Sequence, residues 1–77
     1  MDVNAEIQRA IEGAIPGSRV LVANASPGHF EITVRSLAFE GKKLLDKQRM
    51  VLGAIKHLMA GDAAPVHAID KINALTE

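Results

Sequence analysis

Apolar residues near the start of the chain recur at the spacing of a helix. The apolar positions, mostly three or four residues apart, are Val3, Ile7, Ala10, Ile11 and Ala14. This spacing places them on one face of an α-helix. Asp2 or Asn4 can cap the first turn, and Pro16-Gly17 ends the pattern. The sequence therefore predicts an amphipathic helix in this first segment.

Two short stretches then alternate apolar and polar residues, which is the period of a strand with one covered face. In residues 18–24 the inward positions are Val20 and Val22, and in residues 29–35 they are Phe30, Ile32 and Val34. The turn-forming sequence Ser26-Pro27-Gly28 separates the two stretches. We expect them to pair as an antiparallel hairpin with one face covered.

The longest periodic stretch covers residues 42–60, after a possible turn at 36–39 and a break at Gly41. Placed at about 100° per residue, one arc about 140° wide holds Leu44, Leu45, Val51, Leu52, Ile55, Leu58 and Met59, together with Gln48. The other side holds Lys42, Lys43, Asp46, Lys47, Arg49, Met50 and His57. An exposed methionine among basic residues favours an interface there. Gly53 is interpreted as a point where this helix approaches the sheet closely.

Residues 66–72 follow Gly61 and Pro65 and predict a third strand, whose alternation is broken by Lys71 and Ile72. A strand that returns after a helix usually lies parallel to a neighbour. The expected fold is α+β, with helices on one face of a small mixed three-stranded sheet in the order αββ(α)αβ. Residues 1–77 are expected to form a single domain.

Composition narrows the possible functions. The hydrophobic fraction of 48% supports a core, although a domain of this size buries only about 60% of its unfolded surface, and its core supplies roughly 3–5 kcal/mol. Nine basic residues balance nine acidic ones, so no global field favours a polyanion. Cysteine is absent from the sequence, which excludes disulfides and thiolate ligands from this chain.

The beginning of the chain has neither a basic start nor an apolar run, and no stretch approaches the roughly 20 apolar residues of a membrane span. We expect a soluble, cytoplasmic protein that does not contact membranes. The serines lack a nucleophile-elbow context, and the glycines form neither a P-loop nor a dinucleotide fingerprint. The sequence therefore predicts a protein that is not an enzyme.

The three histidines are the residues most able to bind a metal. His57 falls on the polar side of the long helix, His29 begins the second strand on the face opposite Phe30, and His67 begins the third strand. Taken one at a time, each is more simply an exposed polar side chain. Their local spacing alone does not assign a metal site.

Four short blocks stand in a distinctive order along the chain. They are His29-Phe30, Phe39-Glu40-Gly41-Lys42, Lys47-Gln48-Arg49 and Val66-His67-Ala68. Their order and spacing resemble the BolA family, and the resemblance covers most of the chain. Several BolA proteins have a triplet richer in histidine or arginine at 47–49, so the chain is similar to the short bacterial branch that lacks this feature.

The resemblance implies a fold like that of a class II KH domain and a role in iron–sulfur or iron homeostasis or in the stress response. It implies a chain that is a monomer alone and forms a heterodimer with a monothiol glutaredoxin around a bridging [2Fe–2S] cluster. The histidine that matches His67 is the family's cluster ligand, and a second ligand comes from the loop between the first two strands. His29, at the end of residues 24–28, is the candidate for that second ligand.

The chemistry of the available donors agrees with the need for a partner. Four protein or thiol donors hold a [2Fe–2S] cluster, and this chain offers only imidazoles. The cysteine of the glutaredoxin and the thiol of glutathione would supply the remaining donors, so the chain alone is expected to bind no cluster.

Two alternatives remain open. A nucleic-acid-binding transcription regulator could use the basic residues Lys42, Lys43, Lys47, Arg49 and Lys56 to meet phosphates. The sequence at 40–43 has only one of the two glycines of a KH loop, and exposed aromatics for base stacking are not expected. A metal-free adaptor could instead dock the same glutaredoxin through Met50 and the surrounding lysines.

The last residues depart from the pattern that the resemblance implies. BolA-like chains commonly continue after the third strand with a Thr/Pro turn and a short helix that contains an aromatic residue. This chain ends with Asn73-Ala74-Leu75-Thr76-Glu77. We expect that helix to be missing or reduced, which would expose part of the sheet or of the cluster side.

Overall fold

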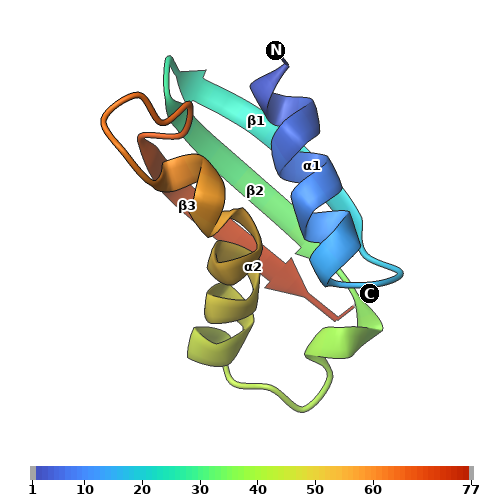
Figure 1. The fold of residues 1–77 in the computed structure, drawn as a ribbon. Coiled ribbons are helices and arrows are strands. Elements are labelled where there is room, and N and C mark those ends of the chain that lie inside the picture. The colour runs from blue at the N-terminus through green and yellow to red at the C-terminus, as the bar shows by residue number, and fades with distance from the viewer. Residues whose placement is uncertain (1, 77) are drawn as a thin grey trace.

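The computed structural model describes residues 2–76 and places both α-helices on one face of a three-stranded sheet (Figure 1). In chain order the elements are α1 (Val3–Ala14), β1 (Arg19–Ser26), β2 (His29–Arg35), the 3₁₀ helix η1 (Leu37–Phe39), α2 (Leu44–Met59) and β3 (Ala68–Leu75). The expected α+β class and the helices on one face are confirmed. Neither α-helix among these residues is long and apolar enough to cross a membrane.

The central strand of the sheet is β2, which pairs with both neighbours. The hairpin of β1 and β2 is antiparallel, with Val22 opposite Ile32, and β3 runs parallel to β2, with Ile72 opposite Ile32. Both pairings agree with the sequence prediction. Because β2 and β3 are parallel, the starts of these two strands lie at the same end of the sheet.

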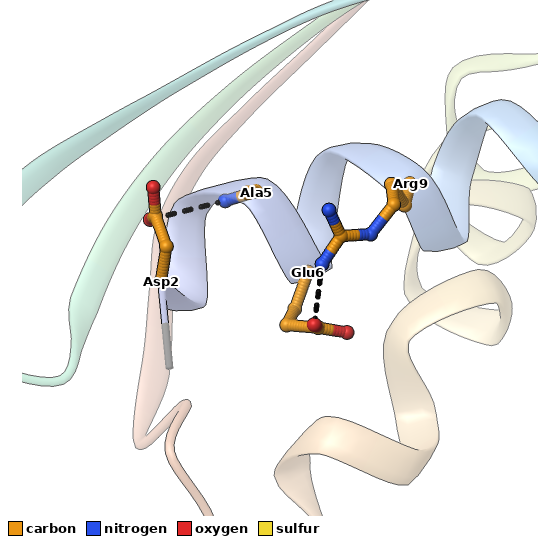
Figure 2. Close-up of polar contacts among 4 residues, drawn as sticks. All are labelled: Asp2, Ala5, Glu6 and Arg9. Carbon is orange, nitrogen blue, oxygen red and sulfur yellow. Dashed lines mark hydrogen bonds and ion pairs between the residues drawn. The ribbon is translucent and has the colours of Figure 1, made fainter.

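Helix α1 begins where its polar start predicts. Asp2 adopts an extended backbone conformation, and its Oδ1 accepts a hydrogen bond from the backbone N–H of Ala5 at 3.3 Å. One turn later Arg9 forms an ion pair with Glu6 on the exposed side of the helix (Figure 2). The cap satisfies one of the unpaired N–H groups of the first turn. The apolar face of α1 then packs on the sheet, with Ile7 and Ile11 fully buried.

The core lies between the two helices and the sheet, and aliphatic side chains fill most of it. Both phenylalanines of the sequence belong to it. Phe30 comes from β2, and Phe39 comes from η1, where the Ser36 Oγ accepts a hydrogen bond from the backbone N–H of Ala38 at 3.0 Å. The buried apolar residues are Ile7, Ile11, Ile15, Val20, Phe30, Ile32, Val34, Phe39, Val51, Ile55, Leu58, Val66 and Ala74.

Helix α2 faces the core with a different side from the one that its apolar residues predict. Val51, Ile55 and Leu58 are buried as expected, but three members of the predicted apolar arc are exposed, namely Leu44 at 63%, Leu45 at 56% and Leu52 at 37%. Met50, predicted to be exposed, is half-buried and packs against the core, as does Ala54. The core-facing arc is therefore turned by roughly 60° from the predicted one.

Two orientations of α2 are possible because the predicted and the observed core-facing arcs both contain Val51, Ile55 and Leu58. The count of apolar side chains favours the arc with more leucines, whereas packing against α1 and β3 selects the arc that contains the small side chain of Ala54. Gly53 consequently lies on the exposed side, where an added Cβ would meet no atom within 4 Å. The interpretation of Gly53 as a close contact with the sheet is wrong.

The third strand begins and ends later than predicted, at Ala68 and Leu75 instead of 66 and 72. The residues before it are held by another contact, since the backbone N–H of Val66 donates to the carbonyl of Leu58 at 3.2 Å. Within the strand, Ile69 lies opposite Phe30 and Lys71 opposite Glu31. This leaves Asp70 as an extra residue in a β-bulge, which explains why the alternation breaks there.

The rotation of α2 can be tested with two substitutions that each remove three carbons from the same helix. We expect Ile55→Ala to lower the free energy of unfolding by about 2–5 kcal/mol, because it opens a cavity in the core. Leu45→Ala should change it by no more than about 0.5 kcal/mol, because its side chain is mostly in solvent. Urea denaturation followed by circular dichroism measures both. Equal losses in the two variants would contradict the observed orientation.

Candidate functional site

The candidate site is at the end of the sheet where the β1–β2 hairpin turns. Pro27 and Gly28 form a two-residue connection between Ser26 and His29, which are Cα partners in the sheet. Gly28 has a φ of +77°, and a proline followed by a glycine with positive φ fits the two central positions of a type II turn. The turn therefore ends with a residue whose backbone conformation favours glycine.

The carbonyl of Gly28 holds the start of the third strand. It accepts hydrogen bonds from the backbone N–H groups of His67 at 2.9 Å and Ala68 at 3.0 Å. Figure 1 shows the loop after α2 beside the hairpin turn at this end of the molecule. The sequence predicts that His67 is the first residue of the third strand. In the structure it is instead the last residue before β3. Its position is nevertheless set by a direct hydrogen bond to the hairpin.

The imidazole ring of His67 lies against the α-carbon of Gly28. A Cβ at position 28 would collide with this ring, coming within 2.9 Å of Cγ and nearer still to Cδ2. Gly28 is therefore required both for the left-handed backbone of the turn and for the space that the ring occupies. The residue His67 as a whole is exposed, so the ring is supported by the turn while remaining open to solvent.

His29 stands on the neighbouring strand at the same end of the sheet. It is the Cα partner of Ala68, the residue that follows His67. His29 is half-buried and belongs to the outer face, since the adjacent Phe30 points into the core. Its Nδ1 lies 3.0 Å from Oδ1 of Asp70, and the two side chains are 44% and 43% exposed. The fold thus brings the two predicted ligand residues to adjacent strand starts.

Imidazole and carboxylate groups are the potential metal ligands at this end of the sheet. Within residues 2–76, no three His, Cys, Asp or Glu side chains gather as they would around a metal ion. Imidazole nitrogens are suitable ligands for iron, and in some [2Fe–2S] centres two histidines hold one of the two irons. His67 and His29 could hold iron here, provided that another molecule supplies the remaining donors.

The residues of the predicted basic interface do not lie together on one exposed helix face. Lys42 and Lys43 precede α2, so the prediction that they lie on the helix is wrong. They are exposed, and a helix about 24 Å long lies between them and the segment that holds His67. Figure 1 shows the loops before and after α2 at opposite ends of the molecule. Arg49 is exposed, but Lys47 is half-buried.

Met50, a candidate for the interface, and His57, the third histidine, are also not part of the site at the hairpin end. Met50 packs against the core, which corrects its prediction as an exposed interface residue. His57 is exposed on α2, and the structure gives it no role at the hairpin end. The structure therefore separates the metal candidates from the residues predicted to bind a partner or nucleic acid.

A pocket lies on the sheet, but not at the histidines. Its volume is about 230 Å³, and its lining residues are Arg19, Val20, Leu21, Thr33 and Arg35. Arg19 begins β1 and Arg35 ends β2, so this pocket is at the far end of the hairpin from Gly28. It does not contribute to the candidate site.

Sequence reasoning missed two residues that shape the site, Gly28 and Asp70. The sequence marks Gly28 as a turn residue, but its contact with His67 depends on a neighbour 39 positions away. The signal for Asp70 is the interrupted alternation of the third strand, which is typical of a bulge. The contacts that these two residues make become known only when the chain is folded.

Comparisons with known proteins agree with this architecture. A sequence model of the family described as BolA-like protein matches residues 7–77. Among curated protein sequences, none matches the chain significantly. The solution structure of BolA1 from Mus musculus is similar at 32% identity and a TM-score of 0.77, covering 99% of this chain and 66% of the mouse chain. The chain thus spans slightly less than two thirds of that relative.

Two further solved structures show the same similarity. A bolA protein homologue from Coxiella burnetii has 32% identity and a TM-score of 0.78, with 99% of this chain and 92% of that chain covered. Yeast Fra2 has 29% identity and a TM-score of 0.72, with coverage of 96% and 78%. The likeness extends over nearly the whole of the present chain in each case.

The dual role of Gly28 can be tested against a second glycine with the same backbone. Gly28→Ala and Gly17→Ala both place a Cβ on a residue with φ near +75°, but the new Cβ meets no atom at Gly17. We expect each variant to lose about 1–2 kcal/mol of stability from the backbone alone. Only Gly28→Ala should also displace the His67 ring and accelerate hydrogen exchange at the His67 and Ala68 amides.

The measurement is amide hydrogen exchange by NMR, together with the nuclear Overhauser contact between the His67 ring and residue 28. If Gly28→Ala preserves both signals as well as Gly17→Ala does, the glycine does not position the histidine.

Proposed function

The chain belongs to the BolA family, and on that premise we propose that it is a non-enzymatic adaptor that binds a monothiol glutaredoxin and shares a bridging [2Fe–2S] cluster with it. The observation that carries this proposal is the double hydrogen bond at Gly28. These bonds anchor His67 beside Gly28, and the residue after Gly28 is His29, the first residue of β2. Two imidazoles from segments far apart in the sequence are thereby presented at one end of the sheet.

The donor count supports sharing with a thiol-bearing partner. His67 and His29 offer one ligating nitrogen each, and the sequence has no cysteine. Four donors hold a [2Fe–2S] cluster, so the cysteine of the glutaredoxin and the thiol of glutathione complete the set. Neutral imidazoles in place of thiolates would raise the reduction potential of such a cluster, and this is the chemistry that His67 and His29 would supply.

The exposure of the two histidines also favours a partner. His67 is exposed and His29 half-buried, so both can contact another protein without rearrangement of the core. The backbone on either side is firmly placed, because Val66 precedes His67 and Phe30 follows His29, and both are buried. Each imidazole is therefore carried by a firmly placed backbone and is open to a second protein.

Nucleic-acid binding has less support from the structure. Both aromatic residues of the chain, Phe30 and Phe39, are in the core, so neither can stack on an exposed base. The loop at 40–43 has one glycine of the two that a KH loop uses. The metal-free adaptor is weakened as well, because Met50 packs against the core instead of projecting from a basic surface.

The proposal is tested by reconstituting the chain with a monothiol glutaredoxin, glutathione, iron and sulfide. We expect the mixed complex to show visible circular dichroism that differs from that of the glutaredoxin alone. His67→Ala should abolish this difference, and His29→Ala should weaken it, because each removes a ligating nitrogen. His57→Ala is the matched control, since it removes an exposed imidazole outside the site.

Two outcomes would overturn the proposal. If His67→Ala leaves the spectrum of the complex unchanged, the histidine is not a ligand. If the two proteins associate equally well with and without cluster, and the complex has the spectrum of the glutaredoxin alone, the chain is a metal-free adaptor.

A further inference from the structure

The bulge in β3 gives the outer face of the sheet an additional side chain beside His29. Ile69 lies opposite Phe30 and Lys71 opposite Glu31, so Asp70 has no Cα partner on β2. An extra residue in a strand re-aims the side chains around it. Here it allows the Asp70 carboxylate to reach across to the His29 ring, with 3.0 Å between Oδ1 and Nδ1.

This contact determines which ring nitrogen of His29 is available to a metal. An ionised carboxylate only accepts hydrogen bonds, so Nδ1 must carry the hydrogen that it donates to Asp70. A neutral imidazole carries one N–H, which leaves the lone pair on Nε2. We propose that Asp70 is a positioning residue, which holds His29 in the Nδ1–H tautomer and keeps Nε2 as its ligating atom.

The exposure of the pair favours this role over a purely structural one. Both side chains are more than two-fifths exposed, and ion pairs in that setting contribute little to folding stability. Metal-ligating histidines, in contrast, usually donate their other ring N–H to a carboxylate or carbonyl, which fixes the tautomer and the ring orientation. The two histidines are therefore positioned by different devices, His67 by the glycine turn and His29 by the carboxylate in the bulge.

The part of this inference that concerns iron rests on the proposed cluster-sharing function, but the hold of Asp70 on His29 does not. The first experiment therefore uses the chain alone, without metal. Long-range ¹H–¹⁵N correlation NMR at neutral pH reports the tautomer of each histidine. We expect His29 to be in the Nδ1–H form in the wild type and in a mixture of tautomers in Asp70→Ala. Asp62→Ala, which removes an exposed carboxylate from the preceding loop, is the matched control.

Two results of this experiment would overturn the inference. One is a wild-type His29 with its hydrogen on Nε2. The other is a tautomer that is the same in Asp70→Ala as in the wild type. Unchanged amide signals of the β2–β3 ladder in Asp70→Ala would show that any change in tautomer comes from the lost carboxylate and not from unfolding.

The second experiment measures how well the complex with glutaredoxin and glutathione retains its cluster against an iron chelator. Loss of such a supporting partner typically costs roughly 10–100-fold in metal affinity. We expect a loss of that size in Asp70→Ala and none in Asp62→Ala. Equal retention in the two variants would overturn the role of Asp70 toward iron.

The failures of the two proposals are distinguishable. If His67→Ala destroys the mixed cluster while Asp70→Ala changes neither tautomer nor retention, the function stands and the positioning role of Asp70 is wrong. If His67→Ala leaves the cluster unchanged, the cluster-sharing function is wrong, and the NMR measurement still decides whether Asp70 holds His29.

Discussion

The carbonyl of Gly28 is the contact on which the arrangement of this protein's histidines depends. By accepting the N–H groups of both His67 and Ala68, it joins the hairpin turn to the point where the chain returns from α2. The parallel pairing of β2 and β3 begins at once beyond it, with His29 opposite Ala68. The backbone freedom of glycine and its lack of a side chain are both used here, because the turn needs a positive φ and the His67 ring needs the space.

The site and the core support one another without overlapping. Each exposed or half-exposed histidine is adjacent in sequence to a buried residue, Phe30 beside His29 and Val66 beside His67. The core therefore fixes the backbone, while the imidazoles remain outside it. Weak surface contacts, such as the one between His29 and Asp70, then only need to choose a ring orientation and a tautomer. Another molecule can therefore reach both imidazoles without disturbing the core.

Helix α2 is the element in which the apolar pattern and the packing disagree. Its existence and approximate length follow from periodicity, but its rotation does not, because Val51, Ile55 and Leu58 belong to two possible arcs. A count of leucines favours one arc, and close packing of the helix against α1 and β3 favours the other. The consequence extends to function, since the same rotation turns Met50 toward the core and removes it from the surface on which a docking site had been predicted.

The sequence by itself determined the class of fold, the hairpin and the first helix, because these depend on local periodicity and turn residues. Its short ordered blocks also singled out the two histidines as candidates. The tertiary structure alone decided how the histidines are held. His29 and Asp70 are 41 positions apart, and they meet only because β3 is parallel to β2 and carries a bulge at that point. Gly28 likewise touches His67 only after the chain has passed through η1 and α2. Local patterns report the propensity of a segment, whereas contacts of this kind depend on register, which is set when distant segments pack together.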